Sequence, residues 1–273
     1  MLTKGLSMSD PVVLLAKDPR GVATVTINRP DVNNAYNGDV IQGLIDAFGD
    51  CAADDAVRVV VLRGNGKHFQ AGADLKWLNA IGALSPEENV EVSRRTASAV
   101  CGLNDFPKPT VALVHGGCFG GGVGIVAACD VVIASEDAIF AITEARWGVM
   151  AGIIVPHLNA AMGPRNVRRY ALTCERFKAA KAAEMGLVHE VCPTGALDEA
   201  AAPVIDQLLL SAPEAITQTK QVILDHANIT LAPAYFEQLV AQHAEKRQSD
   251  EAAEGLKSFA EKRQPAWYPD AAT

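Results

Sequence analysis

The sequence predicts an α/β fold that forms one large domain and ends in a helical region. Three observations support this prediction. Runs rich in β-forming residues alternate with helical runs up to about residue 150, strands almost vanish after Gly163, and 49% of the 273 residues are hydrophobic. A chain of this length and apolar content can bury a full core. The alternation of strands and helices is typical of a sheet with helices packed on its faces.

The α/β part contains five predicted strands separated by amphipathic helices. The strands are runs of β-branched and other apolar residues at 22–27, 57–62, 110–114, 131–134 and 138–142. A helix is predicted between the first two strands, because apolar side chains recur there at helical spacing: Val40, Leu44, Ile45 and Phe48. Further helices are predicted at 89–103 and 121–128.

The C-terminal third is rich in Ala, Leu, Lys and Glu, which favour helices. Helices are predicted at 167–172, 197–210, 213–225 and 235–262. We therefore expect a disordered N-terminal lead (1–11), an α/β core (12–195) and a C-terminal helical region (196–273). A helical tail of this kind packs against a neighbouring subunit or caps its own core.

Charge and hydropathy exclude several classes of function. The net charge of −8 and the pI near 5.3 provide no basic surface for nucleic acid. The N-terminus lacks the apolar stretch of a signal peptide. The longest apolar region, 109–134, is interrupted by His115 and Asp130, which indicates buried sheet and helix rather than a membrane span. We expect a cytoplasmic protein that does not associate with membranes.

The cysteines and histidines indicate neither disulfides nor a metal. Six cysteines are scattered without a CxxC pair, which favours reduced thiols. None of the six histidines belongs to an HExxH or comparable ligand pair. We therefore predict no metal site.

The first segment that could carry chemistry is Phe69-Gln-Ala-Gly-Ala-Asp-Leu75, which follows a predicted strand and leads into an amphipathic stretch. A glycine between two alanines lets a ligand approach the main chain and leaves N–H donors free for a substrate oxygen. A tight turn of small residues without function is the alternative.

The second segment is His115-Gly-Gly-Cys-Phe-Gly-Gly-Gly-Val-Gly124, which leads from a predicted strand into a helix. Free N–H groups at such a helix start suit an oxyanion or a phosphate. The segment lacks the Lys-Ser/Thr of a phosphate-binding P-loop, and no acidic strand end follows at dinucleotide-binding spacing. Close helix packing is the alternative.

The third segment is Thr143-Glu-Ala-Arg-Trp-Gly148, in which Glu144 ends a largely apolar strand. An apolar setting raises the pKa of a carboxyl group toward neutrality and prepares it for proton transfer. Arg146, two residues further on, offers the alternative of a structural ion pair.

In their order and spacing, the three segments resemble the crotonase (enoyl-CoA hydratase/isomerase) superfamily. The resemblance extends to Val22-Ala-Thr-Val-Thr-Ile-Asn-Arg-Pro30, to Asn33-Asn-Ala-Tyr-Asn37 and to Glu254-Gly-Leu-Lys-Ser-Phe-Ala-Glu-Lys-Arg263, so it covers about residues 12 to 267. It implies a spiral core of ββα units (the ClpP/crotonase-like fold), a C-terminal helical trimerisation region, and a homotrimer or dimer of trimers.

The resemblance also implies roles for individual residues. The backbone N–H groups of Ala73 and Gly121 would bind the thioester oxygen, and Glu144 would be the catalytic acid/base. Gly152 matches a main-chain amide near the reacting water. The path of the CoA moiety would be formed by Asn34, Ala35, Ala71, Asp74, Leu75, Lys76, Phe259 and Lys262. No cofactor is implied, because coenzyme A is part of the substrate.

One position departs from the family's pattern. Typical hydratases of the family carry a second glutamate, and Gly124 stands at the matching position here. The surrounding pattern looks more like the branch that hydrates 3-methylglutaconyl-CoA and isohexenylglutaconyl-CoA, in leucine and acyclic-terpene catabolism. Glu144 would then activate water and also protonate the enolate, and Arg146 is the nearest cation in sequence for the acyl carboxylate.

Other functions stay open at this point. Within the superfamily, they are a straight-chain enoyl-CoA hydratase and an enoyl-CoA isomerase, which also works with a single acid/base. From another class, the chain fits a non-catalytic acyl-CoA-binding protein that has kept the fold and lost the chemistry. A serine- or cysteine-nucleophile thioesterase is disfavoured, because the sequence has no GxSxG motif.

Overall fold

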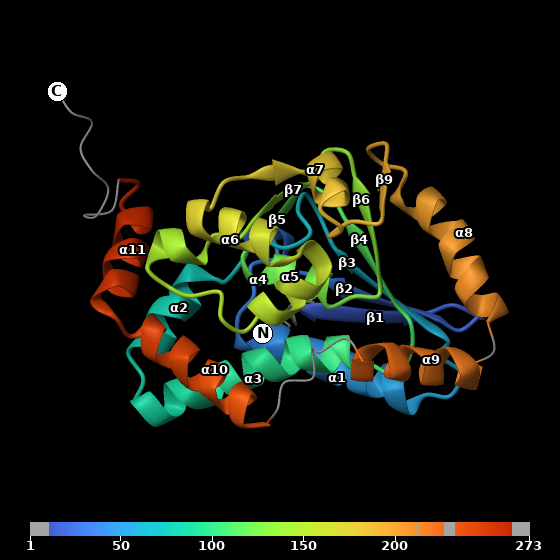
Figure 1. The fold of residues 1–273 in the computed structure, drawn as a ribbon, viewed down its shortest axis with the longest axis horizontal. Coiled ribbons are helices and arrows are strands. Elements are labelled where there is room, and N and C mark those ends of the chain that lie inside the picture. The colour runs from blue at the N-terminus through green and yellow to red at the C-terminus, as the bar shows by residue number, and fades with distance from the viewer. Residues whose placement is uncertain (1–10, 212, 227–232, 264–273) are drawn as a thin grey trace, which may run out of the picture.

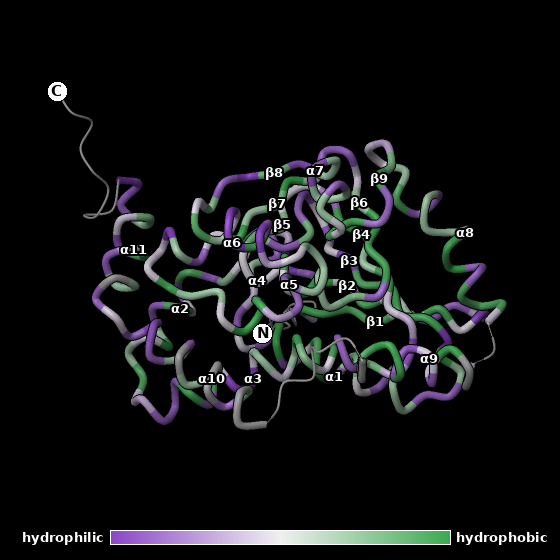
Figure 2. The backbone as a smooth tube through the Cα atoms, viewed as in Figure 1, coloured by the Kyte–Doolittle hydropathy of each residue, from purple (hydrophilic) through white to green (hydrophobic). Residues whose placement is uncertain are grey.

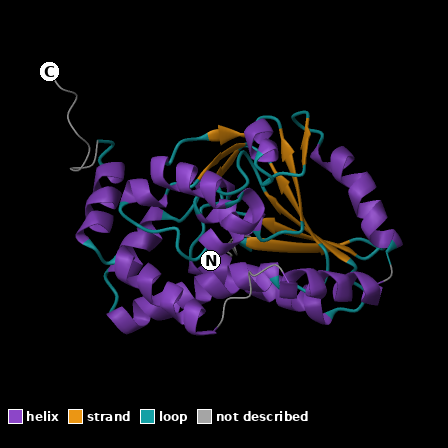
Figure 3. Ribbon diagram, in the orientation of Figure 1, coloured by secondary structure: helices purple, strands orange, loops and turns teal. Residues whose placement is uncertain are grey.

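The structure is a computed structural model that describes residues 11–211, 213–226 and 233–263 (Figure 1). All but the last residue of the predicted N-terminal lead therefore lie outside the described residues. Figure 3 shows the strands enclosed by helices, and the predicted α/β fold is confirmed. Most of the predicted elements are present, with ends shifted by a few residues at most.

The strands are β1 (Val13–Lys17), β2 (Val22–Ile27), β3 (Val59–Gly64), β4 (Thr110–Val114), β5 (Gly117–Phe119), β6 (Val131–Ser135), β7 (Ile139–Ala141), β8 (Phe177–Lys178) and β9 (Glu190–Cys192). The longer helices are α1 (Gly38–Ala53), α2 (Leu75–Gly82), α3 (Pro86–Asn104), α5 (Val155–Met162), α6 (Pro164–Thr173), α8 (Leu197–Leu210), α9 (Pro213–His226), α10 (Pro233–Arg247) and α11 (Asp250–Ala260). Shorter helical segments are η1 (Pro30–Val32), α4 (Gly121–Ala127), η2 (Glu144–Trp147) and α7 (Ala179–Glu184).

The main sheet has six strands in the order β1-β2-β3-β4-β6-β9. All neighbouring pairs are parallel except β1 and β2. The central strands β3 and β4 are apolar at nearly every position, because helices cover both faces of a parallel sheet. Figure 2 shows this as hydrophobic colour along the strands.

The two faces of the sheet bury alternate residues of the same strand. Val60 and Leu62 of β3 belong to the large core on the side of α1, α3 and α4. Val59 and Val61 point to the other face, where they pack in one cluster with Ile205 of α8. Figure 1 shows α8 on the right of the sheet and α1 and α3 below it. Helix α8 thus covers its own chain's sheet.

A second sheet of three strands, in the order β5-β7-β8, positions the candidate site. Strands β5 and β7 are parallel, and Phe119 pairs with Ala141. Because parallel neighbours end at the same edge of a sheet, the residues that follow them lie close together. Gly121 follows β5, and Glu144 follows β7. This sheet therefore brings the second and third sequence segments into contact.

Two sequence predictions differ from the structure. The helix predicted at 235–262 is wrong as a single helix: α10 ends at Arg247, and α11 begins at Asp250. The Ser249 side chain accepts a hydrogen bond from the Ala252 amide and starts the new helix, so the break has an N-cap signal in the sequence. Strand β3 begins two residues later than predicted, because the Val57 amide still bonds within a turn to the Asp54 carbonyl.

Sequence analysis also missed several short elements. Strands β1, β5, β8 and β9 and helix α5 were not predicted. Three of the four strands have three residues or fewer, too few for a periodic pattern. Among the described residues, no helix is both long and apolar enough to cross a membrane.

Candidate active site

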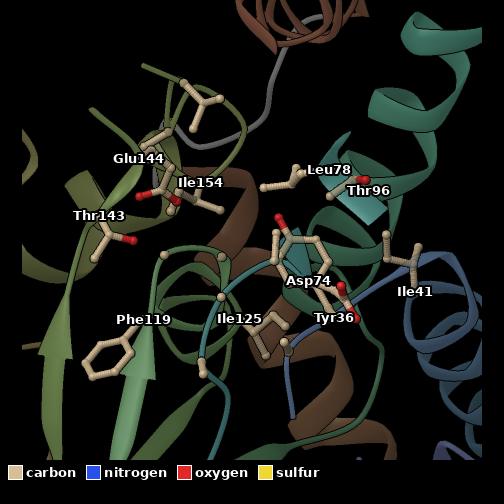
Figure 4. Close-up of a pocket in the computed structure, with 18 of the residues that line it drawn as sticks. Tyr36, Ile41, Asp74, Leu78, Thr96, Phe119, Ile125, Thr143, Glu144 and Ile154 are labelled. Carbon is tan, nitrogen blue, oxygen red and sulfur yellow. The ribbon is translucent and has the colours of Figure 1, made fainter. Parts of the chain in front are cut away.

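A cavity of about 690 Å³ lies between α1, α2, α3, the start of α4, η2 and the C-terminal helices. Its interior wall is mainly apolar, with Ile41, Leu44, Phe48, Leu103 and Ile154 among its residues. Residues from all three candidate segments line it, as the close-up in Figure 4 shows in part. The cavity is therefore the candidate active site.

The Ala73 amide is held in the wall of this cavity by its neighbours on both sides. The Tyr36 amide donates to the Gly72 carbonyl (2.9 Å), and the Asp74 amide donates to the Tyr36 carbonyl (2.8 Å). This short parallel bridge uses the groups on either side of Ala73 and leaves its own N–H unused. In the described chain, the Ala73 amide has no acceptor.

The Gly121 amide lies at the start of α4, where a first-turn N–H has no partner within the helix. Gly120, with φ of +53°, makes the sharp turn that precedes it, and the Gly120 amide donates to the Ala141 carbonyl of β7 (2.9 Å). No hydrogen bond of the described residues uses the Gly121 amide. Two free and rigidly held donors therefore face one cavity, as an oxyanion site requires.

Gln70 contacts both segments that carry the free amides of Ala73 and Gly121. Its side chain is completely buried, and its Oε1 accepts a hydrogen bond from the Gly72 amide (2.9 Å). A Cβ atom on Gly122 would lie 2.4 Å from the same oxygen, so only glycine fits there. The Phe119 amide also donates to the Gln70 carbonyl (2.9 Å), so Gln70 links the two segments that carry the free amides.

Glu144 reaches the cavity from η2 and packs against the glycine turn. A Cβ atom on Gly120 would lie 3.3 Å from Glu144 Oε1. The other carboxylate oxygen, Oε2, is buried and has no hydrogen-bond partner. Burial raises the pKa of Glu144 to about 7, although the backbone amides of Glu144 and Thr143 work against the shift. A carboxyl group with this pKa both accepts and donates protons near neutral pH.

Asp74 is the other carboxylate in the lining, and it is already engaged. It forms an ion pair with Arg29 (3.0 Å) and accepts hydrogen bonds from the Lys76 and Trp77 amides at the start of α2. Burial works to raise the pKa of Asp74, but these hydrogen bonds outweigh it and the pKa lies below its usual value. Among the described carboxylates that line the cavity, only Glu144 has a buried oxygen, Oε2, without a hydrogen-bond partner.

The packing around Gly124 leaves no room for the side chain of a second carboxylate. A Cβ atom at this position would lie only 2.1 Å from Cγ2 of Ile154. The space that a larger side chain needs is thus filled by an isoleucine that lines the cavity. The glycine that departs from the family's pattern is thus closely packed against an apolar side chain.

Tyr36 is a residue that sequence analysis did not single out. It lines the cavity, and a Cβ atom on Gly121 would lie 3.3 Å from its hydroxyl oxygen. Burial and the charge of Glu144 raise the pKa of Tyr36 to about 12, while Arg247 lowers it. The hydroxyl is therefore a neutral donor beside the Gly121 amide. Its only signal in the sequence was its place in the resembling Asn33–Asn37 turn.

The remaining predicted site residues fall into two groups. Among the predicted CoA-binding residues, those that line the cavity are Ala35, Ala71, Asp74, Leu75, Lys76 and Phe259. Their contact with CoA stays a prediction. Gly152 and Lys262 are not in the lining: Gly152 is buried next to Met150, and Lys262 is exposed.

Asn34 and Arg146 also lie outside the lining. The buried Asn34 side chain donates to the carbonyls of Asn65 (2.8 Å) and His68 (2.7 Å), so it stabilises the turn and is not available to a ligand. Arg146 is exposed and donates to the Thr173 carbonyl (3.0 Å). It pairs neither with Glu144 nor with any group of the cavity.

Fold and cavity together define an α/β protein whose candidate active site combines two free backbone amides with one buried carboxylate, of which one oxygen has no partner among the described residues. The family model for enoyl-CoA hydratase/isomerase matches residues 17–270. The chain therefore belongs to the enoyl-CoA hydratase/isomerase family, and the crotonase fold expected from the resemblance is confirmed.

The chain is similar to relatives with different activities. It is 37% identical over 203 residues to a hydroxycinnamoyl-CoA hydratase-lyase of Pseudomonas fluorescens, covering 73% of this chain and 74% of that protein. It is 32% identical to a peroxisomal Delta(3,5)-Delta(2,4)-dienoyl-CoA isomerase of Arabidopsis thaliana, covering 75% and 78%. A crystal structure of an enoyl-CoA hydratase from Mycobacterium avium matches with a TM-score of 0.84 and 32% identity, covering 95% of this chain and 100% of the other.

The packing at Gly124 leads to a first prediction. Gly124→Ala should lower the free energy of unfolding by about 1–3 kcal/mol, because the added methyl group overlaps Ile154. In an Ile154→Ala background, the same change should cost much less. Denaturant unfolding of the two single variants and the double variant measures this coupling. An equal cost in both backgrounds would contradict the proposed overlap.

The raised pKa of Glu144 leads to a second prediction. Its pKa is about 7 in the folded chain and 4.5 ordinarily, so the folded state binds more protons between these values and loses stability as pH rises. The glutamine side chain in Glu144→Gln does not ionise, so the variant keeps its stability as pH rises. The variant should be more stable than the wild type by about 1–3 kcal/mol above pH 7, and the difference should vanish near pH 4. Unfolding curves at pH 4, 6 and 8 test this, and a difference independent of pH would contradict it.

Proposed function

We propose that the protein is an enoyl-CoA hydratase that adds water across the α,β double bond of a 3-branched glutaconyl-CoA thioester, such as 3-methylglutaconyl-CoA or isohexenylglutaconyl-CoA. The observation that carries the proposal is the buried Glu144 carboxylate beside the free amides of Ala73 and Gly121. The wide apolar cavity beyond them supports a branched acyl chain.

The reaction follows from these positions. The thioester oxygen accepts hydrogen bonds from the Ala73 and Gly121 amides, which polarises the conjugated double bond. Ionised Glu144 removes a proton from water, and the hydroxide oxygen bonds to C3 while the π electrons move to the thioester oxygen. Glu144 then gives the same proton to C2 of the enolate. Water is thus added from one face, and Glu144 returns to its ionised form.

In this proposal, the Tyr36 hydroxyl is a third donor to the enolate oxygen. It lies against Gly121, and its high pKa keeps it protonated throughout the reaction. Figure 4 shows the Tyr36 ring and the Glu144 side chain coming from different segments into the same space. A neutral donor at this place would add to the stabilisation that the two backbone amides give the enolate oxygen.

The rest of the substrate is proposed to follow the outer part of the cavity. The CoA moiety would pass Ala71, Leu75 and Lys76 and reach Phe259, which stacks edge-on against Trp147 (4.4 Å between ring centroids). No cofactor is needed, since coenzyme A belongs to the substrate. A cytoplasmic homotrimer or dimer of trimers remains part of the proposal.

An enoyl-CoA isomerase is the second candidate, because the cavity offers one free carboxylate in apolar surroundings and an isomerase occurs among the relatives. Such an enzyme moves a proton without adding water. The two functions differ in the product: a hydratase gives a 3-hydroxyacyl-CoA, and an isomerase gives an enoyl-CoA with a shifted double bond.

The third prediction concerns Glu144. The wild type should hydrate 3-methylglutaconyl-CoA faster than crotonyl-CoA, and Glu144→Gln should lower kcat by at least about 10²-fold, because the other carboxylate among the described lining residues, Asp74, is held in an ion pair with Arg29. For the wild type, kcat/KM should increase as pH rises through about 7, where Glu144 becomes ionised. Loss of enoyl-thioester absorbance and mass spectrometry of the product provide the measurement.

The same assay separates the alternatives. Products without added water would favour the isomerase. Tight CoA-ester binding without turnover in the wild type would favour a non-catalytic acyl-CoA-binding protein. Activity that survives in Glu144→Gln would refute the role of Glu144.

The fourth prediction concerns Tyr36. Tyr36→Phe should lower kcat by about 10–100-fold with little change in KM, because the lost donor acts mainly on the enolate. Thr96→Val, which also removes one hydroxyl from the lining at nearly constant volume, serves as a control, because the Thr96 hydroxyl donates to the Val92 carbonyl of its own helix. A change in KM alone would show that the hydroxyl binds the substrate without stabilising the transition state.

A further inference from the structure

Arg247 is a buried cation in the wall of the cavity. It is the last residue of α10, it is only 6% exposed, and it lines the cavity together with His243. None of the described carboxylates forms an ion pair with it. A buried charge without a counterion is costly, and proteins rarely retain one without a use.

The hydrogen bonds of Arg247 hold its side chain but do not neutralise it. They all come from Nη2, which donates to the carbonyl oxygen (2.9 Å) and the side-chain Oδ1 (2.7 Å) of Asn89 and to the Ser93 hydroxyl. These acceptors are uncharged. The Nε group is buried without a partner, and Nη1 has no acceptor among the described residues.

The groups around Arg247 are also neutral. Burial, and then the charge of Arg247, lowers the pKa of His243 to about 3, so the imidazole carries no charge at neutral pH. Its Nδ1 lies 3.2 Å from the Ser93 hydroxyl. The Asn89 amide group donates to the Ala244 carbonyl of α10, which ties the cluster to the helix. Burial lowers the pKa of Arg247 to about 10, and the guanidinium therefore remains positive at neutral pH.

Tyr36 relates Arg247 to the reaction centre. The pKa of Tyr36 is affected by the charges of both Glu144 and Arg247, with opposite signs. Both groups therefore act on the same hydroxyl in the same cavity. The lining of the cavity is mainly apolar, with Ile41, Leu44 and Ile153 among its residues, so the cation lies in a largely apolar cavity. A cation in such a place is unsuited to a plain hydrocarbon chain and suited to an acyl chain that carries an anion.

We propose that Arg247, held by Asn89 and Ser93, forms a subsite that binds a carboxylate on the acyl chain of the substrate. The inference rests on the proposed function, in that the carboxylate belongs to the acyl group of a CoA thioester. It assigns to Arg247 the role that sequence reasoning gave to Arg146. The free donors and the missing counterion together match a carboxylate, which supplies acceptors and negative charge at once.

Binding of saturated thioesters tests the subsite without requiring any reaction. The acyl chain of 3-methylglutaryl-CoA ends in a carboxylate. The acyl chain of 3-methylpentanoyl-CoA has the same methyl branch and carries no charge. Isothermal titration calorimetry of the wild-type protein should show that the carboxylate-bearing ester binds at least about 10-fold more tightly. Equal affinities would overturn the proposal whatever any variant does.

Variants at position 247 test whether Arg247 causes the difference in affinity between the two esters. Arg247→Gln should weaken binding of 3-methylglutaryl-CoA about 10–100-fold and change binding of 3-methylpentanoyl-CoA less than about threefold. Arg247→Lys, which keeps the charge, should lie in between. Arg94→Gln, on the same helix as Asn89 but paired with Glu91 and Glu237, is the matched control and should leave both affinities unchanged.

The outcomes separate this inference from the proposed function. Equal loss for both esters in Arg247→Gln, with a normal thermal unfolding transition, would mean that Arg247 contacts the CoA part, and would overturn the subsite. Selective loss with no hydration by the wild type would support the subsite and refute the hydratase. If Arg247→Gln does not fold, the comparison of the two esters in the wild type and in Arg247→Lys still tests the subsite.

Discussion

The site depends on keeping two backbone amides fixed and yet free of internal acceptors. A buried N–H normally finds a partner within the protein, so two free donors facing one cavity require the surrounding chain to be fixed by other bonds. The bridge between Tyr36 and Ala73 does this on one side, and the glycine turn before α4 does it on the other. Gln70, which is fully buried, links the two segments through hydrogen bonds to Gly72 and Phe119.

The same glycine turn determines how Glu144 behaves. Without side chains at Gly120 and Gly121, the carboxylate and the Tyr36 ring both approach the turn closely. Ile154 fills the space beside Gly124, so no larger side chain fits there. Burial of the Glu144 carboxyl group at this turn raises its pKa to about 7.

The C-terminal helices contribute to the site as well as to the core. Helix α8 buries the second face of the main sheet, whereas α10 packs on α3 and brings Arg247 to the cavity. The described part of the cavity consequently has a carboxylate from η2 with one unpartnered oxygen and a guanidinium from α10 without an ion pair. Both charges are costly to bury, which is more readily explained by ligand binding and chemistry than by stability.

The sequence by itself determined the α/β class, most of the long elements, the family, and the three segments that carry Ala73, Gly121 and Glu144. These follow from periodicity and from motifs that are local in the chain. The tertiary structure alone decided which polar groups meet. Arg146 is only two residues from Glu144 in sequence, yet it is exposed and donates to the Thr173 carbonyl. Arg247, about a hundred residues further along the chain, lies in the cavity wall. Likewise, Tyr36 gains its place beside Gly121 only through strand pairing and helix packing, which no local pattern encodes.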